Sequence, residues 1–405
     1  MRIVVVNNFF PPRVGGSAHM AASLAQSYAR EGHDVLVVTA AYGQAPRSEE
    51  RDGYRIVRLP AAKMPKLGWS IDFDLSFTAP VPGNRRRLYR LLHEFQPDVL
   101  HLHGQFFDLS WLAGAYARKQ RIPVLLTVHT LLVSDNPAYS ALFRLLDAAV
   151  VRPILRRINP RYVLLDKLGV DYCARRYGVT ARNSERLPIP VDTEHLDHTP
   201  IRDVRAENGI GDGPLIVSLG HVIPLRDRIP LVEALPEILA RHPRTKVLVV
   251  GRVYHDAFLR RAEELGVREA LVVTGAVPRQ DVPSYFAAAD IVTHDLNGGC
   301  GTASLEAMAS GTATIASVAE DNYPGIDLCD GENILLVPPD DASAVASTVV
   351  GLLDDPQRRA GIARRQSGLV RGSFALGVVA KEHLRILEGL CSSTTSAATA
   401  SVPRS

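Results

Sequence analysis

Residues 295–311 combine glycines with a predicted helix start, a pattern typical of anion binding. The stretch reads D-L-N-G-G-C-G-T-A-S-L-E-A-M-A-S-G. Gly298, Gly299 and Gly301 allow backbone N–H groups to approach a ligand that a side chain would keep away. A helix predicted to begin near Thr302 would add unpaired N–H donors and about half a positive charge. The sequence therefore predicts a phosphate-binding loop.

Glu306 adds a carboxylate to the same predicted helix. It follows Thr302 by one helical turn, so the two residues share a face, and its side chain leans back toward the helix N-terminus. A carboxylate there would repel phosphate but can accept hydrogen bonds from sugar hydroxyls. We therefore expect Glu306 to contact hydroxyl groups of the ligand.

Two series of alternating strands and helices would hold this loop. In the first half the predicted strands are 2–6, 34–39, 98–102, 124–128 and 162–165, and the helices include 18–30 and 112–119. In the second half the predicted strands are 215–219, 246–250, 270–274, 290–293, 312–316 and 334–337, followed by helices at 341–353, 356–365 and 374–390. Such alternation predicts an α/β fold with doubly wound parallel sheets, each covered by helices on both faces.

Chain length and a proline-containing passage set the predicted domain limits. A chain of 405 residues exceeds one ordinary core, and the passage R-L-P-I-P-V-D-T at 186–193 is the predicted linker. We predict a Rossmann-like domain over 1–188, a second over 189–372, and a helix over 373–390 that packs back on the first domain. The tail over 391–405 has little apolar content, so we predict that it is disordered.

Composition excludes several classes of function. The formal net charge is only +3, which gives no case for nucleic acid binding. The four cysteines are scattered without paired spacing, which indicates a reducing compartment and no metal site. The N-terminal apolar run is too short for a signal peptide, and no run is long enough to span a membrane. We expect a cytoplasmic protein.

Two segments leave alternatives open. Residues 142–157 combine Leu, Ile and Val with arginines, so this segment could lie on an anionic membrane at its inner face or pack on its own domain, and Pro153 would interrupt it. Residues 60–97 include Trp69, Phe73 and an arginine run, which suits either a solvated surface excursion or an acceptor loop. His101 and His103 alternate like a metal pair, but without a third ligand packing or acceptor contact is preferred.

The chain resembles family 4 of the retaining glycosyltransferases, which have the GT-B fold of two Rossmann-like domains facing across a cleft. The resemblance covers nearly the whole chain and rests on several motifs in the same order. They are G-G-S-A-H-M-A-A-S-L-A at 15–25, L-L-T-V-H-T at 125–130, L-P-I-P-V-D-T-E-H-L at 187–196, V-S-L-G-H-V-I-P-L-R-D at 217–227, V-T-G-A-V-P-R-Q-D-V-P-S-Y-F-A-A-A-D at 273–290, G-C-G-T-A-S-L-E-A-M-A-S-G at 299–311 and D-G-E-N-I-L-L-V-P-P-D-D at 330–341.

The resemblance implies a nucleotide-sugar donor on the C-terminal domain and an acceptor on the N-terminal one. Glu306 would bind the ribose hydroxyls, and Arg226, where the family usually has a lysine, would neutralise the pyrophosphate. His129 would face the reacting sugar, and Val277 would lie in the loop that reads the nucleobase. The backbone positions implied in donor binding are Gly15, Gly16, Gly299, Cys300, Gly301, Thr302 and Ala303.

Two positions depart from the family pattern. Gly298 stands where the family has a glutamate that touches the donor sugar, so that contact is absent or supplied by Asp295 or Asn297. His221 stands where an arginine usually lies beside the pyrophosphate, so part of the positive charge would depend on protonation.

These features predict transfer of a sugar, expected from a UDP-sugar, to an acceptor hydroxyl with retention and without a metal. The departing phosphate oxygen would help to deprotonate the acceptor, and no cofactor is expected beyond the nucleotide sugar itself. The rival interpretation is a GT-B protein that binds nucleotide but no longer turns over. A phosphorylase is disfavoured because no lysine stands at a recognisable pyridoxal site. The acceptor and the oligomeric state cannot be inferred from the sequence.

Overall fold

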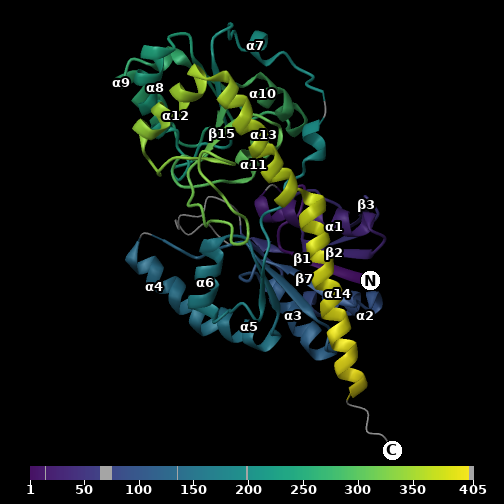
Figure 1. Cartoon of the computed structure of the whole chain (residues 1–405). Coiled ribbons are helices and arrows are strands. Elements are labelled where there is room, and N and C mark those ends of the chain that lie inside the picture. The colour runs from purple at the N-terminus through teal and green to yellow at the C-terminus, as the bar shows by residue number, and fades with distance from the viewer. Residues whose placement is uncertain (14, 64–74, 135, 198, 401–405) are drawn as a thin grey trace, which may run out of the picture. The chain divides into compact units, whose positions relative to one another are not determined.

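A parallel β-sheet forms the framework of each half of the molecule (Figure 1). The computed structural model describes residues 1–13, 15–63, 75–134, 136–197 and 199–400, with side chains described through residue 393. Contacts divide the chain into two compact units, Met1–Pro190 together with Leu376–Ser405, and Val191–Ala375. The domain ends predicted from the sequence are residues 188 and 372.

The first unit is built on an eight-stranded sheet in the order β10-β9-β8-β7-β1-β2-β4-β3. Its strands are β1 (Arg2–Asn7), β2 (Asp34–Ala40), β3 (Ser48–Arg51), β4 (Tyr54–Leu59), β7 (Val99–His103), β8 (Val124–Val128), β9 (Arg161–Leu164) and β10 (Ser184–Arg186). All neighbouring pairs are parallel except β3 with β4. The central strands are runs of Val, Ile and Leu that are buried on both faces, as a covered parallel sheet requires. The short strands β5 (Ala62–Lys63) and β6 (Ser76–Phe77) pair separately.

Helices cover both faces of this sheet. They are α1 (Gly16–Arg30), α2 (Asn84–Phe95), α3 (Asp108–Gln120), α4 (Pro137–Leu146), α5 (Arg152–Ile158), α6 (Lys167–Tyr177) and α14 (Leu376–Ala400). Successive residues of β1 enter opposite cores: Val4 and Val6 pack in one hydrophobic cluster, and Ile3 and Val5 in the other. The two clusters therefore lie on the two faces of one sheet.

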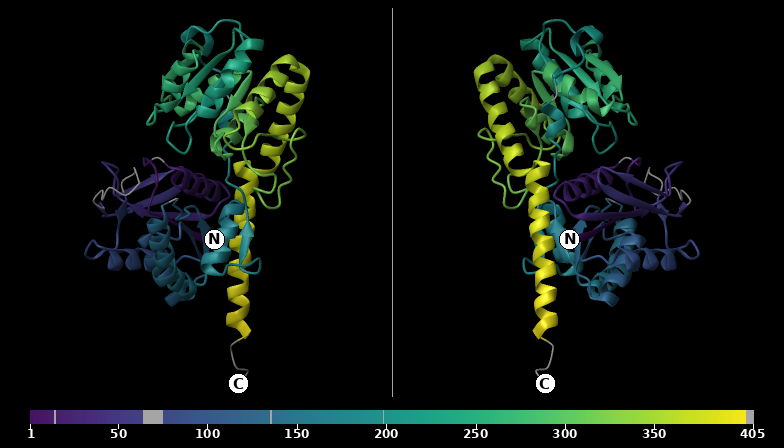
Figure 2. Two further views of the ribbon diagram at one scale, coloured as in Figure 1. Left: turned by 90° about the vertical axis from the view of Figure 1, so that its left-hand side faces the viewer. Right: turned by 90° about the vertical axis from the view of Figure 1, so that its right-hand side faces the viewer.

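The C-terminal helix α14 belongs to the first unit. It packs against α1 (Figures 1 and 2), and its residues Ala380, Leu384 and Leu387 join the same core as Ile3 and Val5. The helix continues to Ala400, so the prediction of disorder is wrong for residues 391–400. Elongating an existing helix needs no new nucleus, and the alanines of this stretch favour helix. Residues 401–405 lie outside the described part of the chain.

The second unit is built on a six-stranded parallel sheet in the order β13-β12-β11-β14-β15-β16. Its strands are β11 (Leu215–Leu219), β12 (Lys246–Val250), β13 (Leu271–Gly275), β14 (Ile291–Thr293), β15 (Ala313–Ala316) and β16 (Leu335–Leu336). Its helices are α7 (Val204–Glu207), α8 (Ile229–Arg241), α9 (Ala257–Glu264), α10 (Val282–Ala288), α11 (Thr302–Ala309), α12 (Ala342–Asp354) and α13 (Pro356–Ser373). The strand order reverses between β11 and β14, which makes the carboxyl ends of these two strands the expected ligand site.

Two helical segments differ from the sequence prediction. Helix α13 runs to Ser373, beyond the predicted end at residue 365, and Gln366 on its buried side bonds the backbone N–H of Thr314. Residues 142–157 form the end of α4, a π-helical turn over Asp147–Val151 and then α5. The helix runs on from α4 through the π-helical turn into α5 without a break, so Pro153 lies inside it, and the π-helical turn before it accommodates the missing N–H. The predicted aromatic pair Trp69 and Phe73 lies outside the described residues.

Candidate functional site

The carboxyl ends of β11 and β14 lie side by side, with Ser218 paired to Thr293. The chain leaves β11 at Gly220, whose φ is 134°, and a Cβ there would lie 2.2 Å from Nε2 of His294. Burial, followed by the nearby arginines, lowers the pKa of His294 well below its usual value. A neutral imidazole therefore packs directly under the loop that carries His221 and Arg226, and only glycine fits at position 220.

Arg226 and Asp295 form the central ion pair of this loop region. Arg226 Nε lies 3.1 Å from Asp295 Oδ2, and the two side chains are 47% and 9% exposed. Burial raises the pKa of Asp295, while Arg226 and then Arg228 act against that rise. A Cβ at Gly299 would lie 2.2 Å from Asp295 Oδ2, so Asp295 also contacts the glycine loop. The pair thus holds the Arg226 guanidinium beside Gly299, with part of it facing solvent.

Arg228 is a buried cation that the sequence motifs did not single out. Its guanidinium donates to the carbonyl oxygens of Arg226 at 2.8 Å and Gly220 at 3.0 Å. Burial lowers its pKa to about 10, so it remains protonated at neutral pH. Arg228 ties the two ends of the 220–226 loop together and adds positive potential beneath it.

The glycine loop leads directly into α11. Gly301 is the N-cap residue, and no side chain caps the helix, so its first N–H groups remain available to a ligand. Tyr323 donates to the Cys300 carbonyl at 2.6 Å, and Ser317 N–H donates to the Gly299 carbonyl at 3.2 Å. These bonds satisfy both carbonyl oxygens within the protein. Burial raises the pKa of Cys300 to about 12, which excludes it as a thiolate nucleophile.

Gly298 has a φ of 113°, a backbone conformation that disfavours any side chain. The two residues expected to replace the absent carboxylate are both engaged. Asn297 Nδ2 donates to Asp340 at 2.7 Å and Asp227 at 3.3 Å, and Asp295 binds Arg226.

Glu306 lies in a compact charged cluster on the first turns of α11. Its carboxylate accepts from Arg279 Nη2 at 3.3 Å and lies 3.9 Å from His195 Nε2, and its side chain is 13% exposed. Burial raises the pKa of Glu306, and Arg279 and His195 oppose this rise. Asp192 completes the cluster at 3.8 Å from Arg279 and 3.7 Å from His195. Of these four residues, only Glu306 was predicted from the sequence. Asp192 and His195 lie in the motif at 187–196, and Arg279 lies in the motif at 273–290.

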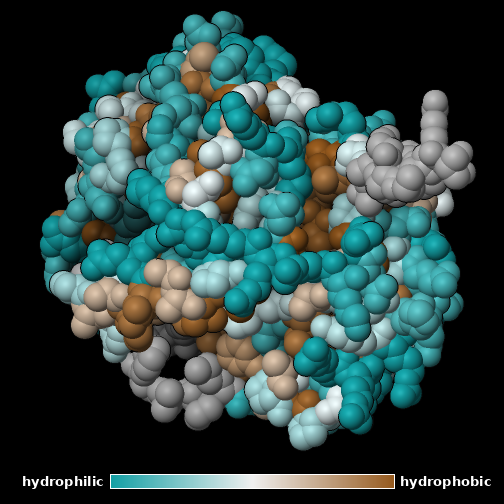
Figure 3. Space-filling view, turned by 90° about the horizontal axis from the view of Figure 1, so that it is seen from below, coloured by the Kyte–Doolittle hydropathy of each residue, from teal (hydrophilic) through white to brown (hydrophobic). Residues whose placement is uncertain are grey.

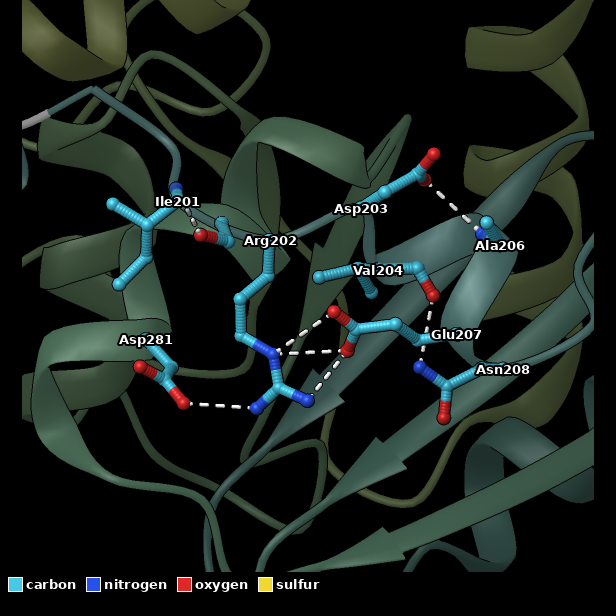
Figure 4. Close-up of polar contacts among 9 residues, drawn as sticks. Ile201, Arg202, Asp203, Val204, Ala206, Glu207, Asn208 and Asp281 are labelled. Carbon is cyan, nitrogen blue, oxygen red and sulfur yellow. Dashed lines mark hydrogen bonds and ion pairs between the residues drawn. The ribbon is translucent and has the colours of Figure 1, made fainter.

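The loop that carries Val277 and Arg279 is fixed at its C-terminal end by a salt bridge. Asp281 at its end accepts from Arg202 Nη1 at 2.9 Å, and the same guanidinium binds Glu207 through Nε at 2.9 and 3.2 Å (Figure 4). Val277 is half-buried just after β13. The salt-bridge network therefore fixes the foot of the loop that the family resemblance assigns to base reading.

His221 is exposed and its imidazole is oriented by two neighbours. Its Nδ1 accepts from the Arg252 backbone N–H at 3.2 Å, and its ring meets Tyr254 edge to face at 5.8 Å. Partial burial and the Arg252 charge lower its pKa, so the free protein carries a neutral His221 at pH 7 with its proton on Nε2.

The remaining predicted residues lie in the first unit. Gly15 is the N-cap of α1, and a Cβ at Gly15 or Gly16 would meet no atom within 4 Å. Packing within the described residues therefore does not require these glycines, which fits a role in admitting a ligand.

His129 follows β8 and is held by a second histidine. Its Nε2 lies 2.9 Å from His103 Nδ1, with the rings stacked at 5.1 Å. Burial and then the nearby His383 lower the pKa of His129 to about 3, so it acts as a neutral hydrogen-bonding group. His101 bonds the Tyr28 hydroxyl at 3.1 Å and the Thr127 hydroxyl at 2.8 Å, which is core packing. Among the described residues, no group of three or more His, Cys, Asp or Glu could hold a metal ion.

The structure thus brings together His221, Arg226, the glycine loop and Glu306 on the second unit. Gly15, Gly16 and His129 lie on the first. Two units of this kind define a GT-B glycosyltransferase fold. The solved structure of Anabaena Alr3699/HepE in complex with UDP matches with a TM-score of 0.74 and 17% identity, covering 96% of this chain and 100% of that one.

The family follows from sequence comparison. A model described as Glycosyltransferase Family 4 matches residues 14–195, and one described as Glycosyl transferases group 1 matches residues 213–355. The chain belongs to glycosyltransferase family 4.

Two relatives from Mycolicibacterium smegmatis match along most of the chain. One is a GDP-mannose-dependent alpha-(1-6)-phosphatidylinositol monomannoside mannosyltransferase, 29% identical over 388 residues, with 91% of this chain and 94% of that protein covered. The other is a phosphatidyl-myo-inositol mannosyltransferase, 29% identical over 394 residues, with 96% and 94% covered.

Proposed function

We propose that the chain transfers a hexosyl group from a nucleotide sugar to a hydroxyl group of an inositol phospholipid, with retention of anomeric configuration. The observation that carries this proposal is Arg226, held by buried Asp295 beside Gly299 at the uncapped start of α11. A cation and helix amides meet there, as a departing diphosphate requires. The acceptor class is suggested by the two Mycolicibacterium relatives, whose names specify phosphatidylinositol substrates.

The chemistry rests on stabilising charge that develops on the leaving group. Breaking the bond between the sugar and the diphosphate leaves negative charge on the β-phosphate, which Arg226 and the α11 amides offset without a divalent metal. The departing phosphate oxygen takes the proton from the acceptor hydroxyl, and that hydroxyl attacks the same face of the sugar. His129, neutral and fixed by His103, supplies a hydrogen bond to the reacting sugar.

A donor and acceptor screen tests the proposal. Purified protein would be incubated with GDP-mannose or UDP-sugars and with phosphatidylinositol vesicles, and products identified by mass spectrometry. We expect a hexosylated phosphatidylinositol, formed equally well in EDTA, and NMR should show the same anomeric configuration in product and donor. An inverted product, or activity that needs added metal, would refute the mechanism.

Glu306→Ala is the matched control for the donor site. In the proposed complex a ribose hydroxyl replaces the contact of the Glu306 carboxylate with Arg279. We expect the variant to bind GDP or UDP at least about tenfold more weakly, as loss of a charged hydrogen bond implies. Unchanged nucleotide affinity by calorimetry would remove Glu306 from the ribose site.

A second candidate function is motivated by Gly298. Glycine at this position supplies no carboxylate to the donor sugar, its positive φ disfavours any side chain, and both neighbouring substitutes are engaged. A protein that binds nucleotide but neither hydrolyses nor transfers any donor in the screen would establish a binding or regulatory role instead.

The chain is also proposed to contact membranes peripherally at their inner, cytoplasmic face. No helix among the described residues is long and apolar enough to cross a bilayer. Leu142 and Leu145 on α4 are 39% and 64% exposed beside Arg144, which suits an anionic lipid surface. The face seen from below in Figure 3 carries apolar and polar surface side by side. Cosedimentation with anionic vesicles, absent with neutral ones, would support this contact, and equal recovery would oppose it.

A further inference from the structure

A hollow of about 320 Å³ lies in the first unit between α3 and α5. Its apolar walls are Trp111 and Leu112 from α3 and Ile154 and Ile158 from α5. The two helices approach closely at Gly114, where a Cβ would lie 2.4 Å from the Ile158 side chain. The hollow, which we call the α3–α5 groove, is thus built mainly by the helix crossing, with Ala79 from the loop before α2 added to its lining.

The polar groups at the floor of the groove already have hydrogen-bond partners within the protein. Asp108, the acidic residue in its lining, already accepts from the backbone N–H and hydroxyl of Thr78 at 2.6 and 3.0 Å and from Asn8 at 2.8 Å. Trp111 donates its indole N–H to the Gln105 carbonyl at 2.7 Å. Since these polar groups are satisfied, the groove presents a hydrocarbon surface, which suits an apolar ligand.

The rim of the groove carries two arginines without partners in the described structure. Arg118 on α3 and Arg157 on α5 are both exposed and line the opening. Neither side chain forms an ion pair or a hydrogen bond with any residue that the structure describes. Guanidinium groups bind phosphate through two parallel hydrogen bonds. Apolar walls beneath two unpaired cations match an amphiphilic anion.

We infer that the α3–α5 groove binds an acyl chain of the phospholipid acceptor, with Arg118 and Arg157 placed for its phosphate. The inference rests on the proposed function for the identity of the lipid. The volume lies at the lower end of the roughly 300–1,000 Å³ typical of small-molecule sites, which suits part of one chain.

Acyl-chain length provides the first test. Phosphatidylinositols with two butanoyl, hexanoyl or octanoyl chains would be compared below their micelle-forming concentrations. Each methylene buried in the groove should lower the acceptor KM by about fourfold, with kcat little changed. A KM that does not depend on chain length would overturn the inference.

Filling the groove provides the second test. Ala115 is exposed and lines the groove, so Ala115→Phe should occupy it without disturbing the core. We expect this variant to lose the chain-length dependence, whereas Gln120→Phe, also exposed on α3 but outside the groove, should keep it. In the same way Arg118→Gln with Arg157→Gln should raise the acceptor KM, and Arg156→Gln, the neighbouring exposed arginine outside the groove, should not.

A binding measurement separates this inference from the proposed function. The chain has two tryptophans, so in Trp69→Phe protein the fluorescence reports Trp111. A short-chain phosphatidylinositol brominated on its acyl chain should quench this signal, and Ala115→Phe should abolish the quenching. Quenching without sugar transfer would refute the proposed acceptor and keep the groove. Transfer without quenching would refute the groove and keep the function. Vesicles of brominated lipids without phosphatidylinositol provide the comparison. If they quench Trp111 as strongly as the brominated phosphatidylinositol does, the groove binds bulk membrane lipid and the inference is overturned.

Discussion

Acid should destabilise the first unit through its buried histidines, and His383 gives the magnitude. His383 on α14 is fully buried, and burial lowers its pKa from 6.5 to about 4. Below pH 6.5 this histidine binds a proton in the unfolded chain. In the folded chain it stays neutral until the pH falls to about 4. The free energy of unfolding is therefore unaffected by His383 above pH 6.5. It falls by about 1.4 kcal/mol per pH unit as the pH drops from 6.5 toward 4.

At pH 5 this single group should cost the folded unit about 2 kcal/mol relative to neutral pH. His101 and His103 are also fully buried, and burial lowers the pKa of each, so they act in the same direction. Because unfolding of two units need not be a single transition, hydrogen exchange of peptides from β7 and β8, corrected for the intrinsic rate, is the suitable assay.

The test compares two leucine variants. His383→Leu should lower the pH dependence of the local unfolding free energy by about 1.4 kcal/mol per pH unit between pH 6 and 5. His93→Leu replaces an exposed histidine near the end of α2 and should leave that dependence unchanged. If His383→Leu keeps the full dependence of the parent protein, buried neutral histidines are not the cause of acid sensitivity.

Three further predictions concern the site. Arg226→Ala should lower kcat by about 10²–10³, the usual effect of losing a group that stabilises developing charge, and steady-state kinetics at saturating donor would show it; a change in KM alone would contradict a role in leaving-group stabilisation. Gly299→Ala places a Cβ 2.2 Å from Asp295 Oδ2 and should misplace Arg226, so its kcat should fall toward that of Arg226→Ala; wild-type kcat would show that the carboxylate can move freely. His103→Leu should lower kcat by about two- to tenfold through loss of one hydrogen bond, and His103→Asn, which keeps a polar atom near the Nδ1 position, should restore most of it; equal losses in both variants would indicate a packing effect instead.

The sheet framework could be predicted from the sequence because its strands are buried apolar runs. The strands at 124–128, 215–219 and 246–250 have the predicted bounds, and each is a run of mainly aliphatic residues. Helix ends were harder to predict, as at α13, because the arginine-rich face of that helix carries little apolar periodicity. Existing helices also propagate cheaply, which explains why α14 passes the predicted limit at residue 390.

The site could be predicted only as far as its motifs reach. The glycine loop and Glu306 were found because their chemistry is local in the sequence. The contacts of Glu306 with Arg279 and of His129 with His103 join residues far apart in the chain, so only the fold reveals them. Arg228 was missed for another reason, since an arginine in sequence gives no sign that it will be buried.

The charged cluster around Glu306 has a consequence for nucleotide binding. In the free protein the carboxylate that should receive ribose hydroxyls already accepts from Arg279, and Asp192 lies 3.8 Å from the same guanidinium. A ribose that takes over Glu306 can therefore leave Arg279 paired with Asp192, so the cation is not stranded. Arg279 stands in the same loop as Val277, whose foot is fixed by the Arg202–Asp281 pair. If Glu306 binds the ribose as proposed, exchange of this one arginine contact would couple nucleotide binding to the side chains of the loop that carries Val277.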